Sequence, residues 1–225
     1  MKIKLVSDFT DYYDHHFDLE GNIFRRVTTD GLDRIGILEY LEKLEFTVPV
    51  YGTVNSLKLK PDDLIVVHHN LRAHRGEEKE LFLYQDALEN YPESLGVKYI
   101  PFHADSDIPE NTKGLSWRYL QIGVESFWLQ YSSVDDWRSN CGDCQIKLSF
   151  RDKTELFSDH QYDDLLIFKY PLFAVDFVPT KDKLYAVDFN IAPGVRGSGV
   201  ENILNAKEAA LSIRTAYEIL HEEHG

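Results

Sequence analysis

Residues 174–194 read AVDFVPTKDKLYAVDFNIAPG, which predicts two adjacent strands joined by a tight turn at residues 180–183. Asp188 and Asn190 are two positions apart, so their side chains point to the same face of a strand. Asp176 precedes the turn, and we expect it to face them across the hairpin. Three oxygen donors on one face suit Mg²⁺, with phosphate completing its ligands. The alternative is an edge hairpin whose aspartates face water.

Composition limits the classes of protein to which the chain can belong. Hydrophobic residues make up 43% of the 225 residues and aromatic residues 13%, which is enough for a substantial core. The formal net charge of −14 argues against binding to nucleic-acid backbones, because such binding needs clustered Lys and Arg. No run of about 18 consecutive apolar residues occurs, so we expect no membrane partner. The N-terminal MKIKLVS is too short and too quickly acidic for a signal peptide, which predicts a cytoplasmic protein.

The first half of the chain alternates predicted strands and helices. Apolar residues recur with a helical period over residues 33–44, and a polar and apolar mixture predicts a second helix near residues 77–90. Short apolar runs at residues 61–67 and 97–101 predict strands, the first of them buried. This alternation indicates a layer of parallel strands with helices.

The second half has a different pattern. Strands are predicted at residues 115–122, 126–131, 145–150, 165–178 and 183–189, and a helix with one apolar stripe at about 200–222. The short turns between these strands indicate an antiparallel sheet capped by that helix. We therefore expect a mixed α/β fold (α+β) with two regions, residues 1–108 and residues 109–225, because turn-forming residues cluster near 104–113.

Three polar loops are candidate ligand sites. The loop after the predicted first strand could act at the carboxyl end of that strand through Asp8, Asp11, Asp14 and His15, with the histidine as acid or base, or could simply be solvated. The end of the strand at residues 61–67 could hold an anion through His68, His69 and Arg72, or these residues could cap strand and helix ends. The loop PGVRGSG, residues 193–199, could cradle phosphate through Gly194 and Arg196, or could be a plain connector.

The chain contains only two cysteines, Cys141 and Cys144, in a Cys-x-x-Cys spacing. Such a pair can be redox-active or can form half of a zinc site. No second cysteine pair is present, and the predicted neighbourhood is not a strand-to-helix turn. We interpret both as ordinary thiols.

Three segments follow one another in the second half of the chain: SWRYLQIG at residues 116–123, DWRSN at residues 136–140, and Asp176 followed by DFN at residues 188–190 and the Pro-Gly at 193–194. In this order they resemble the C-terminal part of ATP-grasp enzymes such as glutathione synthetases and the ligases that add glutamate to ribosomal protein. The chain is also similar to small ATP-grasp-type proteins of tailed phages, through SDFTDYYDH at residues 7–15 and the DWRSN segment.

The resemblance implies a mechanism in which Mg²⁺ bridges ATP and carboxylates, a substrate carboxylate takes the γ-phosphoryl group, and an amine captures the acyl phosphate. It implies that Asp176, Asp188 and Asn190 bind Mg²⁺. It also implies that Arg138 neutralises the transferred phosphoryl group, and that Asn140 positions phosphate or metal. Arg118, Arg196 and His15 complete the catalytic candidates. From the residues alone, Arg138 could equally pair with Asp135 or Asp136.

The sequence departs from the family before Arg118. No paired strands, glycine-rich flap or phosphate-binding lysine is evident there, and Lys98, Lys113, Lys147 and Lys169 follow no pattern. The favoured hypothesis is an ATP- and Mg²⁺-dependent ligase or phosphotransferase that activates a carboxylate of a small molecule or peptide. The alternatives are a non-catalytic phage protein that binds a host nucleotide or protein in the host cytoplasm, and a metal-dependent hydrolase. The sequence indicates neither the acceptor nor the oligomeric state.

Overall fold

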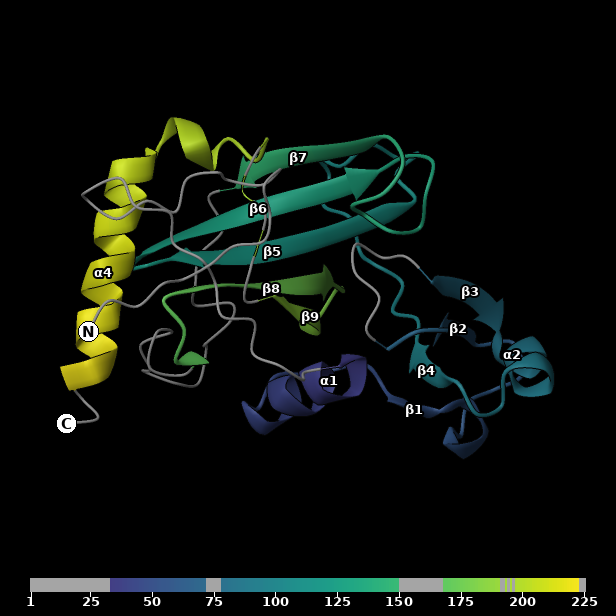
Figure 1. Cartoon of the computed structure of the whole chain (residues 1–225). Helices are drawn as coiled ribbons and strands as arrows, with labels where there is room; N and C mark the ends of the chain where they lie inside the picture. Colours follow the sequence, from purple (N-terminus) through teal and green to yellow (C-terminus); the bar gives the residue numbers. More distant parts are fainter. Residues whose placement is uncertain are drawn as a thin grey trace.

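The computed structural model describes residues 33–71, 78–149, 168–190, 193, 195 and 197–222. Within these residues the chain forms two antiparallel sheets, one of four strands and one of five (Figure 1). The predicted mixed α/β class is confirmed, as is the antiparallel sheet of the second half. The division at residue 108 stays a prediction. None of the described helices is long and apolar enough to cross a membrane.

The four-stranded sheet has the order β1-β4-β2-β3, where β1 is Tyr51–Thr53, β2 is Leu64–His68, β3 is Lys79–Leu83 and β4 is Leu95–Lys98. All its neighbouring strands are antiparallel, so the predicted parallel layer is wrong. The reason is that residues 79–83 form a strand, and the helix α2 is only Tyr84–Asn90. A parallel neighbour needs a crossover of about a dozen or more residues. β3 follows β2 after residues 69–78 only and pairs with it as an antiparallel neighbour.

The core of this sheet lies between its strands and two short helical segments. The 3-10 helix η1 is Val54–Ser56, and it packs with α2 against β2. Ile65 and Val67 alternate along β2 and are fully buried in this cluster. The hydroxyl of Tyr84 donates to the carbonyl of Leu57 at 2.5 Å, which fixes the start of α2 against the segment after η1.

The five-stranded sheet has the order β7-β6-β5-β8-β9. Its strands are β5 Gly114–Ile122, β6 Glu125–Ser133, β7 Cys144–Ser149, β8 Leu172–Pro179 and β9 Leu184–Asn190. Both faces are covered, because Leu120, Ile122 and Leu129 pack in one cluster while Trp117 and Tyr119 pack in another. Most residues of β5 and β6 are therefore buried, on both faces of the sheet.

The helix α4, Ala206–Glu222, covers the first of these faces and is drawn in yellow in Figure 1. The 3-10 helix η3, Val200–Asn202, precedes it, so the predicted helix over 200–222 begins later than expected. Its start is set by a capping box in which Asn205 Oδ1 accepts from the backbone of Lys207 and Glu208, and Glu208 Oε2 accepts from the backbone of Asn205.

The helix α1, Arg34–Lys43, confirms the helix predicted over residues 33–44. The Asp33 side chain caps it by accepting from the backbone N–H of Gly36 at 2.9 Å. Leu38 packs against Leu95 and Val97 of the four-stranded sheet, whereas Leu41 packs in the aromatic cluster of the five-stranded sheet. Figure 1 shows α1 beside β9 and next to β1. The helix therefore packs against both sheets, and this packing determines the position of its first turn.

We predict that Leu41→Ala lowers the free energy of unfolding by about 2–5 kcal/mol, because it leaves a cavity where α1 meets the five-stranded sheet. Leu41 is fully buried, whereas Leu211 on α4 is half exposed. The same truncation at Leu211 should therefore cost less than about 0.5 kcal/mol. Urea unfolding of the two variants checks this, and equal losses would contradict the position assigned to α1.

Candidate functional site

The two aspartates predicted to share a face are neighbours in the structure. Asp176 of β8 pairs directly with Asp188 of β9, and Ala174 pairs with Asn190. The pairing shifts between Asp176 and Phe177, so the strands are irregular at this point. Bulges of this kind increase local twist and change the direction of side chains. The expectation that the turn brings Asp176 opposite Asp188 is therefore confirmed.

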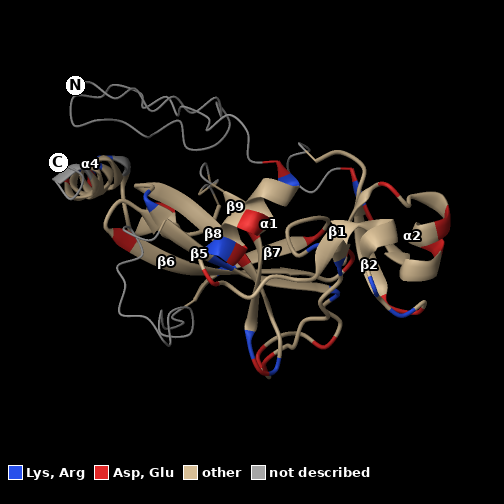
Figure 2. Ribbon diagram, turned by 90° about the horizontal axis from the view of Figure 1, so that it is seen from below, with Lys and Arg blue, Asp and Glu red and all other residues tan. Residues whose placement is uncertain are grey.

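Each aspartate is bound by an arginine from another element. Arg118 lies opposite Asp176 on β5, and its Nε and Nη2 donate to the two carboxylate oxygens at 2.6 and 2.8 Å. Arg34 of α1 donates from Nη1 to Asp188 Oδ1 at 2.6 Å. Figure 2 shows that α1 carries both basic and acidic residues along its length. Predicted as a catalytic candidate, Arg118 thus forms a two-point ion pair with a predicted metal ligand.

Arg34 is a site residue that the sequence analysis missed. It is the first residue of α1, and its backbone N–H donates to the carbonyl of Leu71 at 3.0 Å. The packing of α1 on both sheets directs its side chain to Asp188, a residue 154 positions away. Its Nε is buried and, among the residues that the structure describes, has no hydrogen-bond partner. No local signal marks this role, since an arginine in a first helical turn is usually a surface residue.

The loop between β6 and β7 presents Trp137 and Arg138. Arg138 donates from Nε and Nη2 to Asp136 at 2.9 and 2.6 Å, and its backbone N–H also reaches Asp136. This is the ion pair considered as the alternative to a phosphate-binding role. Asp135 fixes the loop by accepting from the Ser133 hydroxyl and the Asp143 backbone, both at 2.9 Å.

Gly114, at the start of β5, holds this loop close to the sheet. A Cβ at this position would lie 2.7–2.8 Å from backbone atoms of Asp136, Trp137 and Arg138. Contacts that short require the backbone to move, so only glycine allows the loop to lie here. The loop therefore has a defined position against the sheet.

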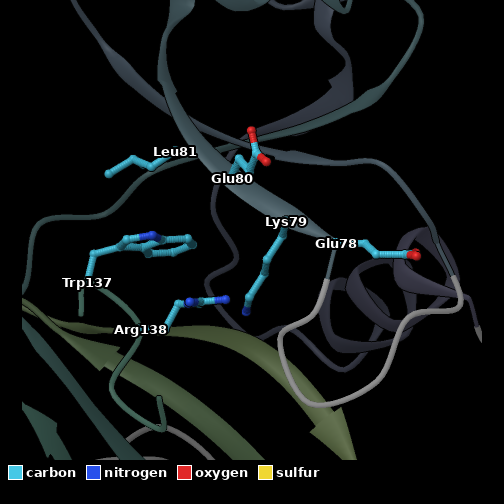
Figure 3. Close-up of a pocket in the computed structure, with 6 residues that line it drawn as sticks. All are labelled: Glu78, Lys79, Glu80, Leu81, Trp137 and Arg138. Carbon is cyan, nitrogen blue, oxygen red and sulfur yellow. The ribbon is translucent and has the colours of Figure 1, made fainter. Parts of the chain in front are cut away.

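A pocket of about 540 Å³ lies between this loop and β3. Figure 3 shows Lys79 and Arg138 extending toward each other, Leu81 beside Trp137, and Glu80 pointing away from both. Lys79 Nζ is 5.7 Å from the centre of the Trp137 ring, and Arg138 Cζ is 5.8 Å from it. The pocket thus has a cationic end and an apolar end. Its lining residues are Glu78, Lys79, Glu80, Leu81, Trp137 and Arg138.

Lys79 is the second site residue that the sequence analysis missed. Burial, followed by repulsion from Arg34, lowers its pKa to about 8. Arg138 acts in the same direction, while Asp188 and Cys141 oppose the shift. Residues 77–90 were interpreted as one helix, and the strand pattern that places Lys79 in the pocket was therefore not recognised. The four lysines considered from the sequence are not among the residues that line this pocket.

His68 lies directly opposite Lys79 on β2 and is buried. Burial, with the charges of Arg34 and Lys79, lowers its pKa to about 3, so it is neutral at pH 7. It can therefore donate or accept a hydrogen bond but adds no positive charge. His69 packs edge-on against the Tyr91 ring at 4.9 Å. It does not line the pocket itself, but its backbone N–H donates to the Glu78 carbonyl at 2.9 Å and its Nε2 lies 3.8 Å from Glu80 Oε2.

The remaining predicted residues divide into two groups. Asn140 is exposed in the loop after Arg138 and accepts from the Cys141 thiol at 3.6 Å. Cys141 and Cys144 are both free thiols. Seven residues predicted to belong to the site lie outside the described part of the chain: Asp8, Asp11, Asp14, His15, Arg72, Gly194 and Arg196.

The cluster that we call the interface charge cluster contains Arg34, Lys79, Arg118 and Arg138 with Asp136, Asp176 and Asp188. Four basic residues meet three carboxylates, which leaves one excess positive charge when Lys79 is protonated. The whole chain has a net charge of −14. Glu78 and Glu80 also line the pocket and are not counted in this cluster. The basic groups of the cluster are where an anion would be attracted in an otherwise acidic chain.

The donors suit a hard cation such as Mg²⁺, since two carboxylates and an amide lie on adjacent strands. Both carboxylates are nevertheless balanced by guanidinium groups. Within residues that the structure describes, no cluster of three His, Cys, Asp or Glu could hold a metal. The oxygen donors are of the type that Mg²⁺ prefers, but both carboxylates have arginine partners that a cation would have to replace. The role of Asp176, Asp188 and Asn190 as its ligands stays a prediction.

No protein-family model and no curated protein matches this sequence. Its structure is similar to the crystal structure of D-alanine–D-alanine ligase from Bacillus anthracis complexed with ATP, with a TM-score of 0.51 and 13% identity, over 85% of this chain and 67% of that one. It is also similar to the ATP-grasp ligase PsnB complexed with a minimal precursor, with a TM-score of 0.53 and 12% identity. That match covers 84% of this chain and 60% of PsnB. Identities this low establish the fold alone.

We predict that Arg118→Ala lowers the free energy of unfolding by about 3–5 kcal/mol, because it leaves the Asp176 carboxylate buried without its partner. The Arg118 and Asp176 side chains are only 11% and 15% exposed. The control is Arg214→Ala, which breaks an ion pair with Glu218 in which both side chains are mostly exposed. That change should cost less than about 1 kcal/mol. Thermal or urea unfolding measures both, and a similar loss in the two variants would refute the importance of the buried pair.

Proposed function

Because this chain has the ATP-grasp fold, we propose that it is a ligase that binds ATP in the pocket between its two sheets. In this proposal the phosphates lie at the cationic end of the pocket, and the acceptor is a carboxylate of a small molecule or peptide. The similar structures support this choice: one is a D-alanine–D-alanine ligase with bound ATP, and the other is an ATP-grasp ligase with a precursor.

The observation that carries the proposal is the position of Lys79 against Arg138. The two side chains come from different sheets and extend toward each other across the pocket. Burial and then repulsion from Arg34 lower the pKa of Lys79 most, and Arg138, which is itself paired with Asp136, adds a smaller contribution in the same direction. A phosphate group between them would remove the repulsion. Guanidinium and ammonium groups are the common protein partners of phosphate.

The proposed chemistry is phosphoryl transfer followed by capture. A carboxylate oxygen of the substrate forms a bond to the γ-phosphorus as the bond to ADP breaks, and an amine then attacks the acyl carbon and releases phosphate. Negative charge accumulates on the phosphoryl oxygens during the first step, and Lys79 and Arg138 are placed to stabilise it. Asn140, which follows in the same loop, is proposed to position the phosphate. Mg²⁺, when bound near Asp176 and Asp188, supplies further charge neutralisation between the phosphates.

The arginine partners of the two aspartates favour a second candidate. Asp176 and Asp188 are both neutralised within the protein, which is the arrangement expected if the chain binds a nucleotide without turning it over. In that case the same pocket would hold ATP, but no acyl phosphate would form. The two candidates share the binding step and differ only in whether ADP is produced.

Titration calorimetry with ATP and Mg²⁺ tests the shared step. Lys79→Gln should weaken ATP binding at least about tenfold, since it removes one charge-assisted contact. The matched control Lys207→Gln changes an exposed lysine on α4 and should bind as the native protein does. Equal binding by native protein and Lys79→Gln would refute the pocket. If ATP binds but candidate carboxylates and amines release no ADP, the binding protein is the better description.

The pH dependence of ATP binding gives a separate prediction. The protonated form of Lys79 binds phosphate, so the affinity should fall as pH rises through about 8, the pKa of Lys79 in the unliganded protein. A bound phosphate raises that pKa, and binding near pH 8 should therefore take up protons. Lys79→Arg should remove this dependence, because arginine stays charged. Calorimetry in buffers of different ionisation enthalpy measures the uptake, and its absence in the native protein would contradict the assignment.

A further inference from the structure

We propose that Arg34 is the counter-ion that Asp188 releases when a divalent cation enters the interface charge cluster. Arg34 would then set how tightly the protein binds that cation. This inference rests on the proposed function only for the claim that the cation arrives with nucleotide. The exchange itself concerns residues of this chain and a metal ion.

The two aspartates differ in how firmly they are held. Asp176 receives two hydrogen bonds from Arg118, and its side chain is 15% exposed. Asp188 has an ion pair with Arg34 through one guanidinium nitrogen, and its side chain is 37% exposed. Two-point pairs are stronger than one-point pairs, and a more exposed carboxylate loses less solvation when partners exchange. Asp188 is therefore the carboxylate that a cation reaches first.

Arg34 has a reason to change partners. Within the described ranges its buried Nε has no hydrogen-bond partner, so the guanidinium uses its donors there incompletely while Nη1 faces Asp188. A buried donor that lacks a partner costs free energy. An anion close to the cluster would supply acceptors to the released guanidinium, next to Lys79, whose charge Arg34 already influences. Release of Arg34 from Asp188 and binding of phosphate thus favour each other.

The backbone of Arg34 has no need to move in this exchange. Leu38 and Leu41 hold α1 in the cores of both sheets, and Asp33 caps its first turn. The change is confined to the long Arg34 side chain, which can reorient about its flexible stem. Metal alone meets a carboxylate that is already neutralised and should bind weakly. When metal and nucleotide bind together, the metal gains Asp188 as a ligand and the phosphate gains the released Arg34. The metal should then bind more tightly.

The test uses Mn²⁺ as a probe, with its binding to the full chain followed by electron paramagnetic resonance in the absence of nucleotide. Arg34→Gln should tighten Mn²⁺ binding about tenfold or more, because it leaves Asp188 without its counter-ion. Arg214→Gln removes the same charge from an exposed site and should leave the affinity unchanged. Arg34→Lys keeps a cation near Asp188 and should retain the weak binding of the native protein.

Two outcomes would overturn the inference. One is that Arg34→Gln binds Mn²⁺ no more tightly than Arg214→Gln does. The other is that the gain persists in the double variant Arg34→Gln with Asp188→Asn, which would place the ion elsewhere. Circular dichroism establishes that each variant is folded. If Arg34→Gln does not fold, native protein and Asp188→Asn are compared with a non-hydrolysable ATP analogue. The analogue should then tighten Mn²⁺ binding at least about tenfold more in the native protein, and an equal effect in both would also overturn the inference.

The proposed function can fail independently of this inference. If the native protein binds no ATP analogue, the ligase proposal is wrong. The affinity of Arg34→Gln for Mn²⁺ alone would still report on the exchange at Asp188.

Discussion

The pairing of Asp176 with Asp188 on adjacent strands is the constraint on which the site depends. The register of β8 and β9 brings the two carboxylates together, and like charges that lie side by side in a partly buried position require cations. The protein supplies Arg118 from the neighbouring strand and Arg34 from α1. The location of α1 between the sheets is therefore coupled to the electrostatics of the hairpin, because the same helix fills two cores and neutralises one aspartate.

The site is divided between the sheets. The five-stranded sheet contributes the aspartates, Arg118 and the loop with Arg138, whereas the four-stranded sheet contributes Lys79. The basic groups are spread over both sheets and α1, with Lys79 on the four-stranded sheet and Arg34 on α1. Arg118 and Arg138 belong to the five-stranded sheet and its loop. Relative movement of the sheets would change the distance between Lys79 and Arg138, and with it the affinity for an anion. A ligand that joins these cations would hold the two sheets together.

The hairpin and the five-stranded sheet could be predicted from the sequence because strand period and turn position determine the register locally. The parallel first layer was a wrong prediction, since charges and leucines at residues 77–90 satisfy a helical pattern as well as a strand followed by a short helix. That error concealed Lys79. Arg34 could not be predicted for another reason: its partner is 154 residues away, and the contact depends on how α1 packs against both sheets. Arg138 and its pairing with Asp135 or Asp136 were both considered from the sequence, and the folded loop selects Asp136.

A crystal structure of the protein with Mg²⁺ and a non-hydrolysable ATP analogue tests the central claim most directly. The account predicts phosphate density between Lys79 and Arg138, with the Asp188 carboxylate on the metal ion and Arg34 turned toward phosphate. Arg118 should keep both contacts to Asp176. Nucleotide density elsewhere on the chain, or an unchanged Arg34–Asp188 pair beside a fully occupied nucleotide and metal, would contradict it.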